Sequence, residues 1–262
     1  MGGGDFNVIL AYASIDYGYP WWLSYGHLPV LAIALALFVV GYLRHWHWWP
    51  MALWALLACW ATAAFLVDRF AIDINGRAAL PTERFLAQGT GRVLDIGAGT
   101  GRWSIMVLTA RPHATMVVSD LFGESFDQHF GREGSPQQRL LASLKAAGVD
   151  RRATIQTADM RKLPFESAEF DAVVSAYAMD HLNREGSDQA LVEAARVLKP
   201  GGEFLLMLVA NEAWGRFVFG PLLAHGGLRS YDWWTQHAEK AGFRVLEQGT
   251  RPITFYILAR KP

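Results

Sequence analysis

Two long apolar segments open the chain, and an alternation of shorter apolar segments follows them. Residues 28–43 carry no charge, and after Arg44–His47 a second uncharged segment runs over residues 48–67. A membrane-spanning helix needs about 20 predominantly apolar residues, within a range of about 17–25. The second segment meets this length, whereas the first meets it only if residues 21–27 contribute. The pattern therefore predicts two membrane helices joined by a short turn.

Tryptophans and small residues support this interpretation. Tryptophan rings prefer the headgroup level of a bilayer, and here they flank the two segments, as Trp21, Trp22, Trp46, Trp48 and Trp49. Small residues at four-residue spacing let two helices approach closely in lipid; the candidates are Ala32, Ala36, Ala55, Cys59 and Ala63. A soluble hairpin buried in the core, and a shallow hairpin that never crosses the bilayer, are the alternatives.

Beyond these segments, strand-like and helix-like patterns alternate. Candidate strands occupy residues 92–96, 115–120 and 170–175, and a helical pattern covers 138–147. Such alternation predicts an α/β domain with a doubly wound, mostly parallel sheet.

Charge divides the chain at the same place. Of 24 basic residues only Arg44 precedes Asp68, and of 24 acidic residues only Asp5 and Asp16 do. We therefore expect an aromatic N-terminal segment over 1–27, membrane helices over 28–67 and a soluble domain over 68–262. The net charge is zero with no basic stripe, which disfavours a nucleic-acid partner. A single cysteine, with histidines scattered along the chain, predicts neither a disulfide framework nor a metal site.

A glycine-rich turn directly follows the first candidate strand. It reads Asp95-Ile96-Gly97-Ala98-Gly99-Thr100-Gly101, and glycine lets a backbone turn tightly and approach a ligand. The dehydrogenase fingerprint requires glycine at position 102, where Arg102 stands, so a nicotinamide oxidoreductase is disfavoured. A carboxylate at Asp95 suits a ligand that carries an ammonium group and no pyrophosphate.

With this motif the chain resembles the class I S-adenosylmethionine-dependent methyltransferases. The resemblance covers about 190 residues and implies a seven-stranded sheet that ends in an antiparallel hairpin over 241–262. It implies S-adenosylmethionine as donor, S-adenosylhomocysteine as product, and no metal. The implied donor contacts come from the glycine turn and from the ends of three further strands, namely Asp95, Gly97, Ala98, Gly99, Gly101, Asp120, Leu121, Asp159, Met160, Ser175 and Ala176.

Within that set the resemblance gives three residues specific roles. It assigns Asp120 to the ribose hydroxyls, Asp159 to the adenine amine and Met160 to the adenine ring. One departure is an insertion over 122–134, which is expected either to be disordered or to fold over the ribose.

Candidates for catalysis follow the fourth strand, because ligands of parallel sheets bind beyond the carboxyl ends of the strands. They are Tyr177, Asp180 and His181. His181 is the general base by residue type, with Asp180 to orient it or to bind a cationic acceptor. The alternative for His181 is a structural histidine at the start of a helix.

Two flanking segments are candidates for enclosing the site. Residues 15–22, with Tyr17 and Tyr19, are expected either to close over the donor as a lid or to anchor in the interface. Residues 213–225 are the second candidate, as a wall of the acceptor pocket.

These observations predict a membrane-anchored methyltransferase of a hydrophobic acceptor, such as a lipid, an isoprenoid or quinone-like molecule, or a lipophilic thiol. Its partners are that acceptor and the bilayer. The alternatives are a tethered enzyme of water-soluble molecules and a non-catalytic S-adenosylmethionine-binding scaffold. Because the donor is cytosolic, we expect the soluble domain on the cytoplasmic face of the cytoplasmic membrane, although Arg44 in the turn argues for the opposite side.

Overall fold

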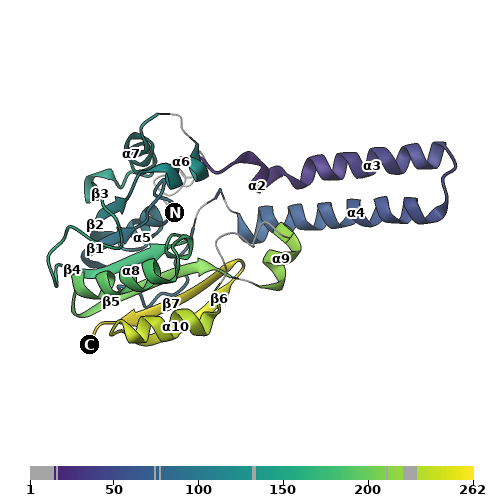
Figure 1. Cartoon of the computed structure of the whole chain (residues 1–262). Coiled ribbons are helices and arrows are strands. Elements are labelled where there is room, and N and C mark those ends of the chain that lie inside the picture. Colours follow the sequence, from purple (N-terminus) through teal and green to yellow (C-terminus); the bar gives the residue numbers. More distant parts are fainter. Residues whose placement is uncertain are drawn as a thin grey trace.

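A seven-stranded mixed sheet forms the centre of the α/β domain in the computed structural model (Figure 1). The structure describes residues 15, 17–73, 75–76, 78–131, 134–210, 212–220 and 229–262, with the backbone alone at 125, 128, 129 and 214. The strand order is β3-β2-β1-β4-β5-β7-β6. The strands are β1 (Thr90–Ile96), β2 (His113–Asp120), β3 (Ala153–Thr157), β4 (Phe170–Ala176), β5 (Leu198–Val209), β6 (Arg244–Arg251) and β7 (Thr254–Arg260).

The first five strands are parallel, and the last two form an antiparallel edge. This arrangement confirms the predicted seven-stranded α/β sheet with its terminal hairpin. In β1 the run Val93–Ile96 is buried on both faces, as is typical of a central parallel strand.

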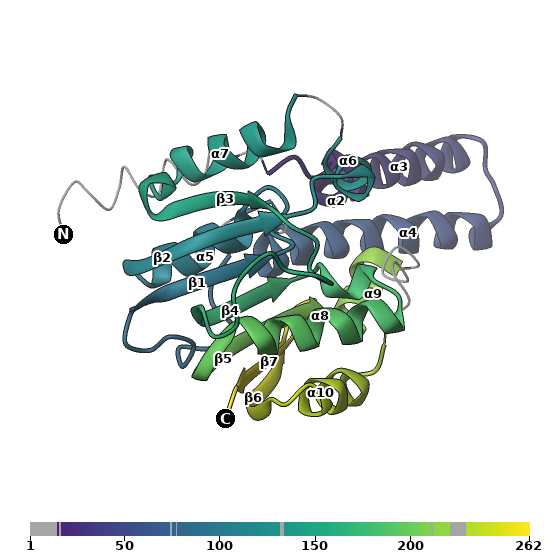
Figure 2. The same ribbon diagram turned by 60° about the vertical axis from the view of Figure 1, so that its left-hand side comes forward.

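Helices cover both faces of the sheet (Figure 2). The helices of this domain are α5 (Arg102–Ala110), α6 (Glu124–Phe130), α7 (Pro136–Ala146), α8 (Arg184–Val197), α9 (Ala213–Phe219) and α10 (Tyr231–Lys240), with short 3-10 turns η2 (Asp150–Arg152) and η3 (Met179–His181). Helices α8 and α10 pack in one apolar cluster, and α5 and α7 in the other. The second cluster also takes in Tyr17 and Phe85 from the segments that precede β1.

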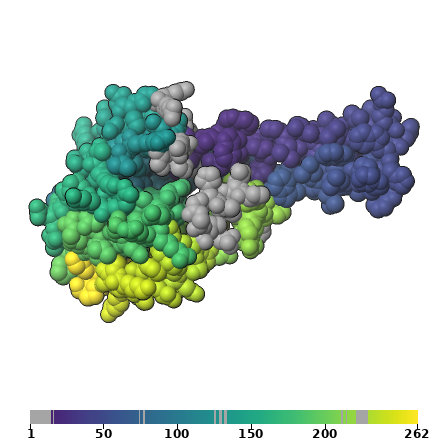
Figure 3. Space-filling model, in the orientation of Figure 1, coloured from purple at the N-terminus to yellow at the C-terminus, as the bar shows by residue number. Residues whose placement is uncertain are grey.

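Two antiparallel helices project from this domain as a rod (Figures 1 and 3). They are α3 (His27–Leu43) and α4 (Trp48–Val67), preceded by the short α2 (Trp21–Tyr25) and followed by a π-helical turn η1 (Asp68–Ile72). Ala34 is buried in α3, and Ala58, Ala61 and Ala64 are buried in α4. The expected small-residue contact is therefore wrong for Ala32, Ala36 and Cys59, which are exposed, whereas Ala55 and Ala63 are half-buried.

One continuous helix within the described residues is long and apolar enough to cross a membrane. It runs over Trp48–Ile72, with 25 residues, and an 18-residue window within it has a mean hydropathy of 1.8, whereas the helix His27–Leu43 is shorter. Only 17% of its most apolar window is buried. The two expected membrane spans are thus present as helices, and their placement in a bilayer stays a prediction.

The base of the hairpin is fixed to the soluble domain by polar contacts. His27 Nε2–H donates to the carbonyl oxygen of Val218 at 2.8 Å, and Trp60 Nε1–H donates to that of Phe217 at 2.9 Å. Both acceptors belong to α9, which therefore packs on α4. None of the side chains described in α9 lines the donor cavity below. The expected role of residues 213–225 as a wall of the acceptor pocket stays a prediction, and residues 221–228 lie outside the described residues.

Candidate donor site

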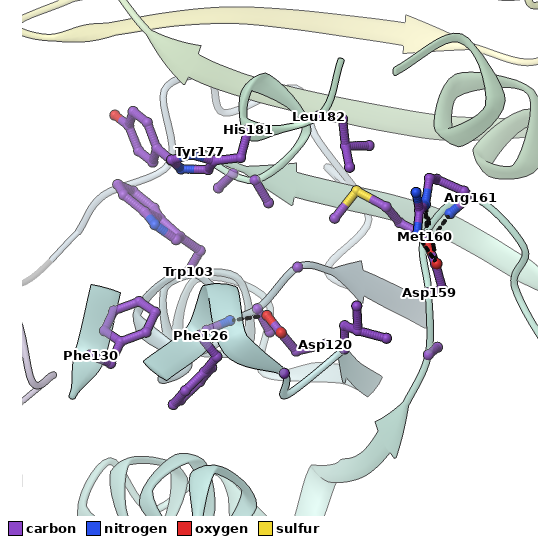
Figure 4. Close-up of a pocket in the computed structure, with 18 of the residues that line it drawn as sticks. Trp103, Asp120, Phe126, Phe130, Asp159, Met160, Arg161, Tyr177, His181 and Leu182 are labelled. Carbon is purple, nitrogen blue, oxygen red and sulfur yellow. Dashed lines mark hydrogen bonds and ion pairs between the residues drawn. The ribbon is translucent and has the colours of Figure 1, made fainter. Parts of the chain in front are cut away.

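A cavity of about 360 Å³ opens at the carboxyl ends of β1, β2, β3 and β4 (Figure 4). It is lined by Tyr19, Gly97, Ala98, Gly99, Trp103, Asp120, Leu121, Gly123, Phe126, Phe130, Ala158, Asp159, Met160, Arg161, Ala176, Tyr177, Ala178, His181 and Leu182. Its volume is within the range of about 300–1,000 Å³ that small-ligand sites occupy. Most of the predicted donor contacts therefore lie around one cavity.

The glycine turn forms the floor of this cavity. Gly97, Gly99 and Gly101 have φ values of +79°, +55° and +90°, which side chains with a Cβ rarely adopt. A Cβ at position 97 would overlap that of Ala178, and a Cβ at position 99 would approach Phe130 Cζ to 2.8 Å. Glycine at positions 97 and 99 therefore lets the turn after β1 lie close to the segment after β4 and to α6.

Asp120 closes the end of β2 and points into the cavity. Its Oδ2 accepts from the Gly99 backbone N–H at 2.8 Å, and its Oδ1 accepts from that of Phe122 at 3.1 Å. A carboxylate has about four acceptor positions, so both oxygens keep capacity for ligand hydroxyls. This geometry suits the predicted ribose contact.

Three predicted donor contacts lie behind the turn instead of in the lining. Asp95 is fully buried and accepts from Ser104 Oγ–H at 2.5 Å, while its Oδ1 has no partner among the described residues. Burial raises the pKa of this carboxyl to about 7, with the Ser104 hydrogen bond opposing and the charge of Asp120 adding to the shift. Ser175 Oγ–H donates to the Ile96 carbonyl oxygen at 3.0 Å, and Gly101 packs against Leu140. These residues shape the turn from below.

Asp159 and Met160 lie on the far side of the cavity. Arg161 holds the Asp159 carboxylate through its guanidinium, at 2.6 Å from Nη2 to Oδ2, and through its backbone N–H at 2.9 Å. These contacts lower the pKa of Asp159 and keep it ionised. The Met160 methyl lies beside the glycine turn, where a Cβ at Gly97 would approach it to 3.0 Å. Both residues are therefore placed to contact an adenine ring, and the Asp159 carboxylate is already paired with Arg161.

The three predicted catalytic residues occupy different settings. His181 is exposed and lines the cavity. Asp180 does not line it; its Oδ1 is buried without a hydrogen bond among the described residues, and burial raises its pKa against the attraction of His181. Tyr177 has a φ of +52°, and its hydroxyl pairs with Thr254 Oγ1. Burial raises the Tyr177 pKa, so its hydroxyl stays protonated.

The N-terminal aromatic segment lies against the glycine turn. Thr100 Oγ–H donates to the Tyr17 carbonyl oxygen at 2.7 Å, and Tyr17 is buried below the cavity. Tyr19 reaches the lining, where its ring meets that of Phe130 edge-on at 5.3 Å between centroids. Residues 1–14 and 16 lie outside the described residues. Of the two tyrosines, Tyr19 alone therefore lines the cavity, and closure of the segment over the donor stays a prediction.

Part of the insertion over 122–134 forms helix α6 (Glu124–Phe130). Residues 132–133 lie outside the described residues. In this helix Phe126 and Phe130 stand four residues apart and both line the cavity, next to Asp120 (Figure 4). The described part of the insertion therefore folds over the expected ribose position.

Among the lining residues that the sequence did not single out are four large side chains, Trp103, Phe126, Phe130 and Arg161. Trp103 follows the glycine turn by two positions, and the two phenylalanines have the spacing of one helix face. These patterns were available, whereas the contact of Arg161 with the neighbouring Asp159 depends on the β3 loop geometry.

The lining fits a nucleoside donor that carries a positive charge. Two carboxylates, Asp120 and Asp159, face the cavity together with one guanidinium, Arg161, which is paired with Asp159. The glycine turn leaves room for a ligand against the backbone, and aromatic rings enclose it. Within the described ranges no group of three His, Cys, Asp or Glu residues is arranged to hold a metal ion.

Comparison with known sequences supports this interpretation. Residues 93–202 match the family model described as "Methyltransferase domain". A "Demethylmenaquinone methyltransferase" of Deinococcus radiodurans is 32% identical over 146 residues, 56% of this chain and 54% of the relative. A "Ubiquinone/menaquinone biosynthesis C-methyltransferase UbiE" of Bartonella henselae is 34% identical over 160 residues, 60% of this chain and 53% of the relative. The chain thus spans about half the length of the curated relatives it matches.

Solved structures share the fold. An "O-methyltransferase family 2 protein" of Planctomyces limnophilus in complex with apigenin aligns with a TM-score of 0.53 and 15% identity, over all of this chain and 66% of that one. The [4+2]-cyclase SpnF aligns with a TM-score of 0.52 and 18% identity, over 69% of this chain and 78% of that one. A cyclase on this fold illustrates that reaction type is set by the site. Residues 93–202 therefore match a methyltransferase domain in sequence, and the sheet that contains them has the fold of these solved structures.

Proposed function

We propose that this methyltransferase domain is held at the cytoplasmic face of a membrane and methylates a lipophilic, quinol-like acceptor. When bound, S-adenosylmethionine supplies a methyl group activated by a sulfonium. The protein's part is alignment and exclusion of water. The acceptor atom forms a bond to the methyl carbon, and the electron pair of the carbon–sulfur bond stays on sulfur. The acceptor loses one proton.

The observation that carries the proposal is the position of the apolar hairpin. Arg102, the first residue of α5 and the residue directly after the glycine turn, donates from Nε to the Gly76 carbonyl oxygen at 3.0 Å. Its Nη2 donates to the carbonyl oxygen of Asp73 at 2.9 Å. Asp73 follows directly on η1, at the end of the hairpin. The root of the hairpin is therefore tied to the carboxyl edge of the sheet, where the donor cavity opens.

The exposed surface of the hairpin supports a bilayer as its surroundings. Tryptophans stand exposed at both ends of the rod, with Trp21 62%, Trp48 73% and Trp49 61% accessible. Large apolar side chains such as Ile33 and Leu56 are exposed between them, at 58% and 69%. A soluble surface rarely leaves so many contiguous apolar groups in water, whereas lipid solvates them. A domain anchored in this way meets acceptors that partition into the membrane.

The acceptor class rests on the relatives and on the site. Relatives of about one-third identity are named for methylation in menaquinone and ubiquinone biosynthesis. His181 lines the donor cavity and is, by residue type, the general base that would take the proton that a quinol hydroxyl or ring carbon releases.

The proposal is tested with the full chain in lipid nanodiscs and methyl-tritiated S-adenosylmethionine. We expect tritium in the organic extract with a prenylated 1,4-naphthoquinol. Transfer to a soluble naphthoquinol that lacks the prenyl group is expected to be much slower. Equal rates on both, in nanodiscs and in detergent alike, would favour a merely tethered enzyme. Donor binding without transfer to any acceptor would favour the scaffold.

A further inference from the structure

A second cavity lies next to the donor cavity. Its volume is about 260 Å³. It is lined by Ala71, Ile72, Ala78, Ala79, Leu80, Pro81, Arg102, Trp103, Tyr177, Met207, Arg251, Pro252, Ile253 and Thr254. The lining comes from the root of the hairpin, the start of α5, the ends of β4 and β5, and the β6–β7 turn.

Two aromatic side chains separate the two cavities. Trp103 and Tyr177 line both of them, and their ring centroids lie 4.9 Å apart. Tyr177 is fixed from two sides, because its backbone N–H donates to the Met207 carbonyl oxygen at 2.9 Å and its hydroxyl pairs with Thr254. The edge between these two rings is therefore where a molecule in the second cavity comes nearest to the donor cavity.

The charges of the second cavity differ from those of the first. Arg102 and Arg251 line it, and no carboxylate does among the described residues. Arg102 lies over Trp103, at 4.6 Å from its ring, and Arg251 donates to the Pro81 carbonyl oxygen at 2.8 Å. Glu247, which accepts from the Tyr256 hydroxyl, interacts electrostatically with Arg251 but does not line the cavity. The lining thus suits a flat ring that bears oxygen acceptors or a negative charge.

The rim of the cavity continues into the hairpin. Ala71 and Ile72 belong to η1, and two large apolar side chains on the preceding turns, Leu66 and Phe70, are 47% and 79% exposed. A volume of about 260 Å³ is small for a whole lipophilic molecule, since ligand sites span about 300–1,000 Å³. The head of such a molecule fits inside while its chain runs out along α4.

We propose that the second cavity is the acceptor site, which takes the oxygen-bearing ring of a lipophilic acceptor with its hydrocarbon chain directed into the bilayer. The inference rests on the proposed function and adds to it the place of the acceptor and the residues that select it. Arg102 and Arg251 recognise the ring oxygens, and the Trp103–Tyr177 pair sets the edge at which ring and donor meet.

The test fills the cavity and leaves the donor site untouched. Ala79 is an exposed residue of the loop before β1 and lines the cavity, whereas Ala87, also exposed in that loop, lines none of the cavities described here. In Ala79→Trp we expect the KM for a prenylated naphthoquinol to rise by about tenfold or more, and calorimetric binding of 2-methyl-1,4-naphthoquinone to weaken equally. S-adenosylhomocysteine affinity stays at the wild-type value. Ala87→Trp behaves as wild type in all three.

A second pair of variants keeps the inference decidable if Ala79→Trp does not fold. Arg251→Leu removes the cation, and Arg251→Lys keeps it; we expect weakened quinone binding in the first and partial recovery in the second. Wild-type quinone affinity and acceptor KM in both Ala79→Trp and Arg251→Leu would overturn the assignment of the cavity while the proposed function stands. Failure of the wild-type protein to bind or methylate any quinone would instead overturn the proposed function.

Discussion

The Asp120 carboxylate accepts a hydrogen bond from the backbone N–H of Gly99 at 2.8 Å, across 21 positions of the chain. This contact joins the end of β2 to the glycine turn after β1. Through its other oxygen Asp120 also holds the Phe122 backbone N–H, at the start of the insertion. One carboxylate thus fixes the turn, orients α6 and faces the cavity.

Replacement of Asp120 is expected to weaken donor binding. In Asp120→Asn one oxygen remains to accept from Gly99, but the charge that strengthens hydrogen bonds to hydroxyls is lost. We predict about tenfold weaker S-adenosylhomocysteine binding for Asp120→Asn and a larger loss for Asp120→Ala, measured by calorimetry. Unchanged affinity in both variants would mean that the ligand does not contact this carboxylate.

The turn at Gly97 offers a test that separates backbone strain from steric overlap. Gly97→Ala places a methyl group against Ala178, whereas Gly89→Ala, at a φ of +75° with open space around it, adds strain alone. A left-handed conformation costs a residue other than glycine about 1–2 kcal/mol. We expect both variants to lose that stability in chemical unfolding, and Gly97→Ala alone to lose donor binding. Equal donor affinities in the two variants would contradict the placement of the site.

His181 and Tyr177 are expected to affect turnover differently. His181→Ala removes the proton acceptor, so we predict kcat to fall by about 10²–10⁴, with donor affinity maintained. Tyr177→Phe removes only the hydrogen bond to Thr254, because the hydroxyl stays protonated; we expect a change in acceptor KM and little change in kcat. Steady-state kinetics on the naphthoquinol distinguish the two, and an unaltered kcat in His181→Ala would show that deprotonation does not need it.

Asp95 gives the fold a specific dependence on pH. Its pKa is raised from 3.8 to about 7 by burial, so the folded protein retains a proton that the unfolded chain loses. The contribution of Asp95 to stability is therefore present below about pH 4 and is lost as pH rises through 7. At about 1.4 kcal/mol per pKa unit, the loss is on the order of 4 kcal/mol.

Asp95→Asn removes this titration and keeps an acceptor for Ser104. We predict that the wild-type free energy of unfolding, minus that of Asp95→Asn, falls between pH 4 and pH 7 and is flat above pH 8. Because other groups titrate in both proteins, the difference isolates Asp95. A difference independent of pH would show that Asp95 is ionised in the folded protein throughout.

Local sequence patterns were sufficient for the strands and for the glycine turn. The alternation after Asp68 gave the correct positions of β1, β2 and β4, since a buried parallel strand appears as a short apolar run. Asp120 and Asp159 were assigned through the resemblance to the methyltransferases; Asp120 is the last residue of β2, and Asp159 lies two residues after β3. These features depend on neighbours in the chain and on rules that hold for any parallel sheet.

Contacts between segments that are distant in the chain could not be predicted from the sequence. The face on which α3 and α4 meet depends on their rotation, and both helices are apolar all round, so no periodicity distinguishes Ala61 from Cys59. The contact of Trp60 with α9 joins positions 157 residues apart. For the same reason Asp95 was expected to face the ligand, although the tilt of the turn places it behind the lining.

The most direct test is calorimetric titration of the full chain in nanodiscs with S-adenosylhomocysteine and, separately, with NADH. The account predicts micromolar binding of S-adenosylhomocysteine, its loss in Gly97→Ala, and no heat with NADH. Binding of NADH, or full affinity for S-adenosylhomocysteine in Gly97→Ala, would contradict it.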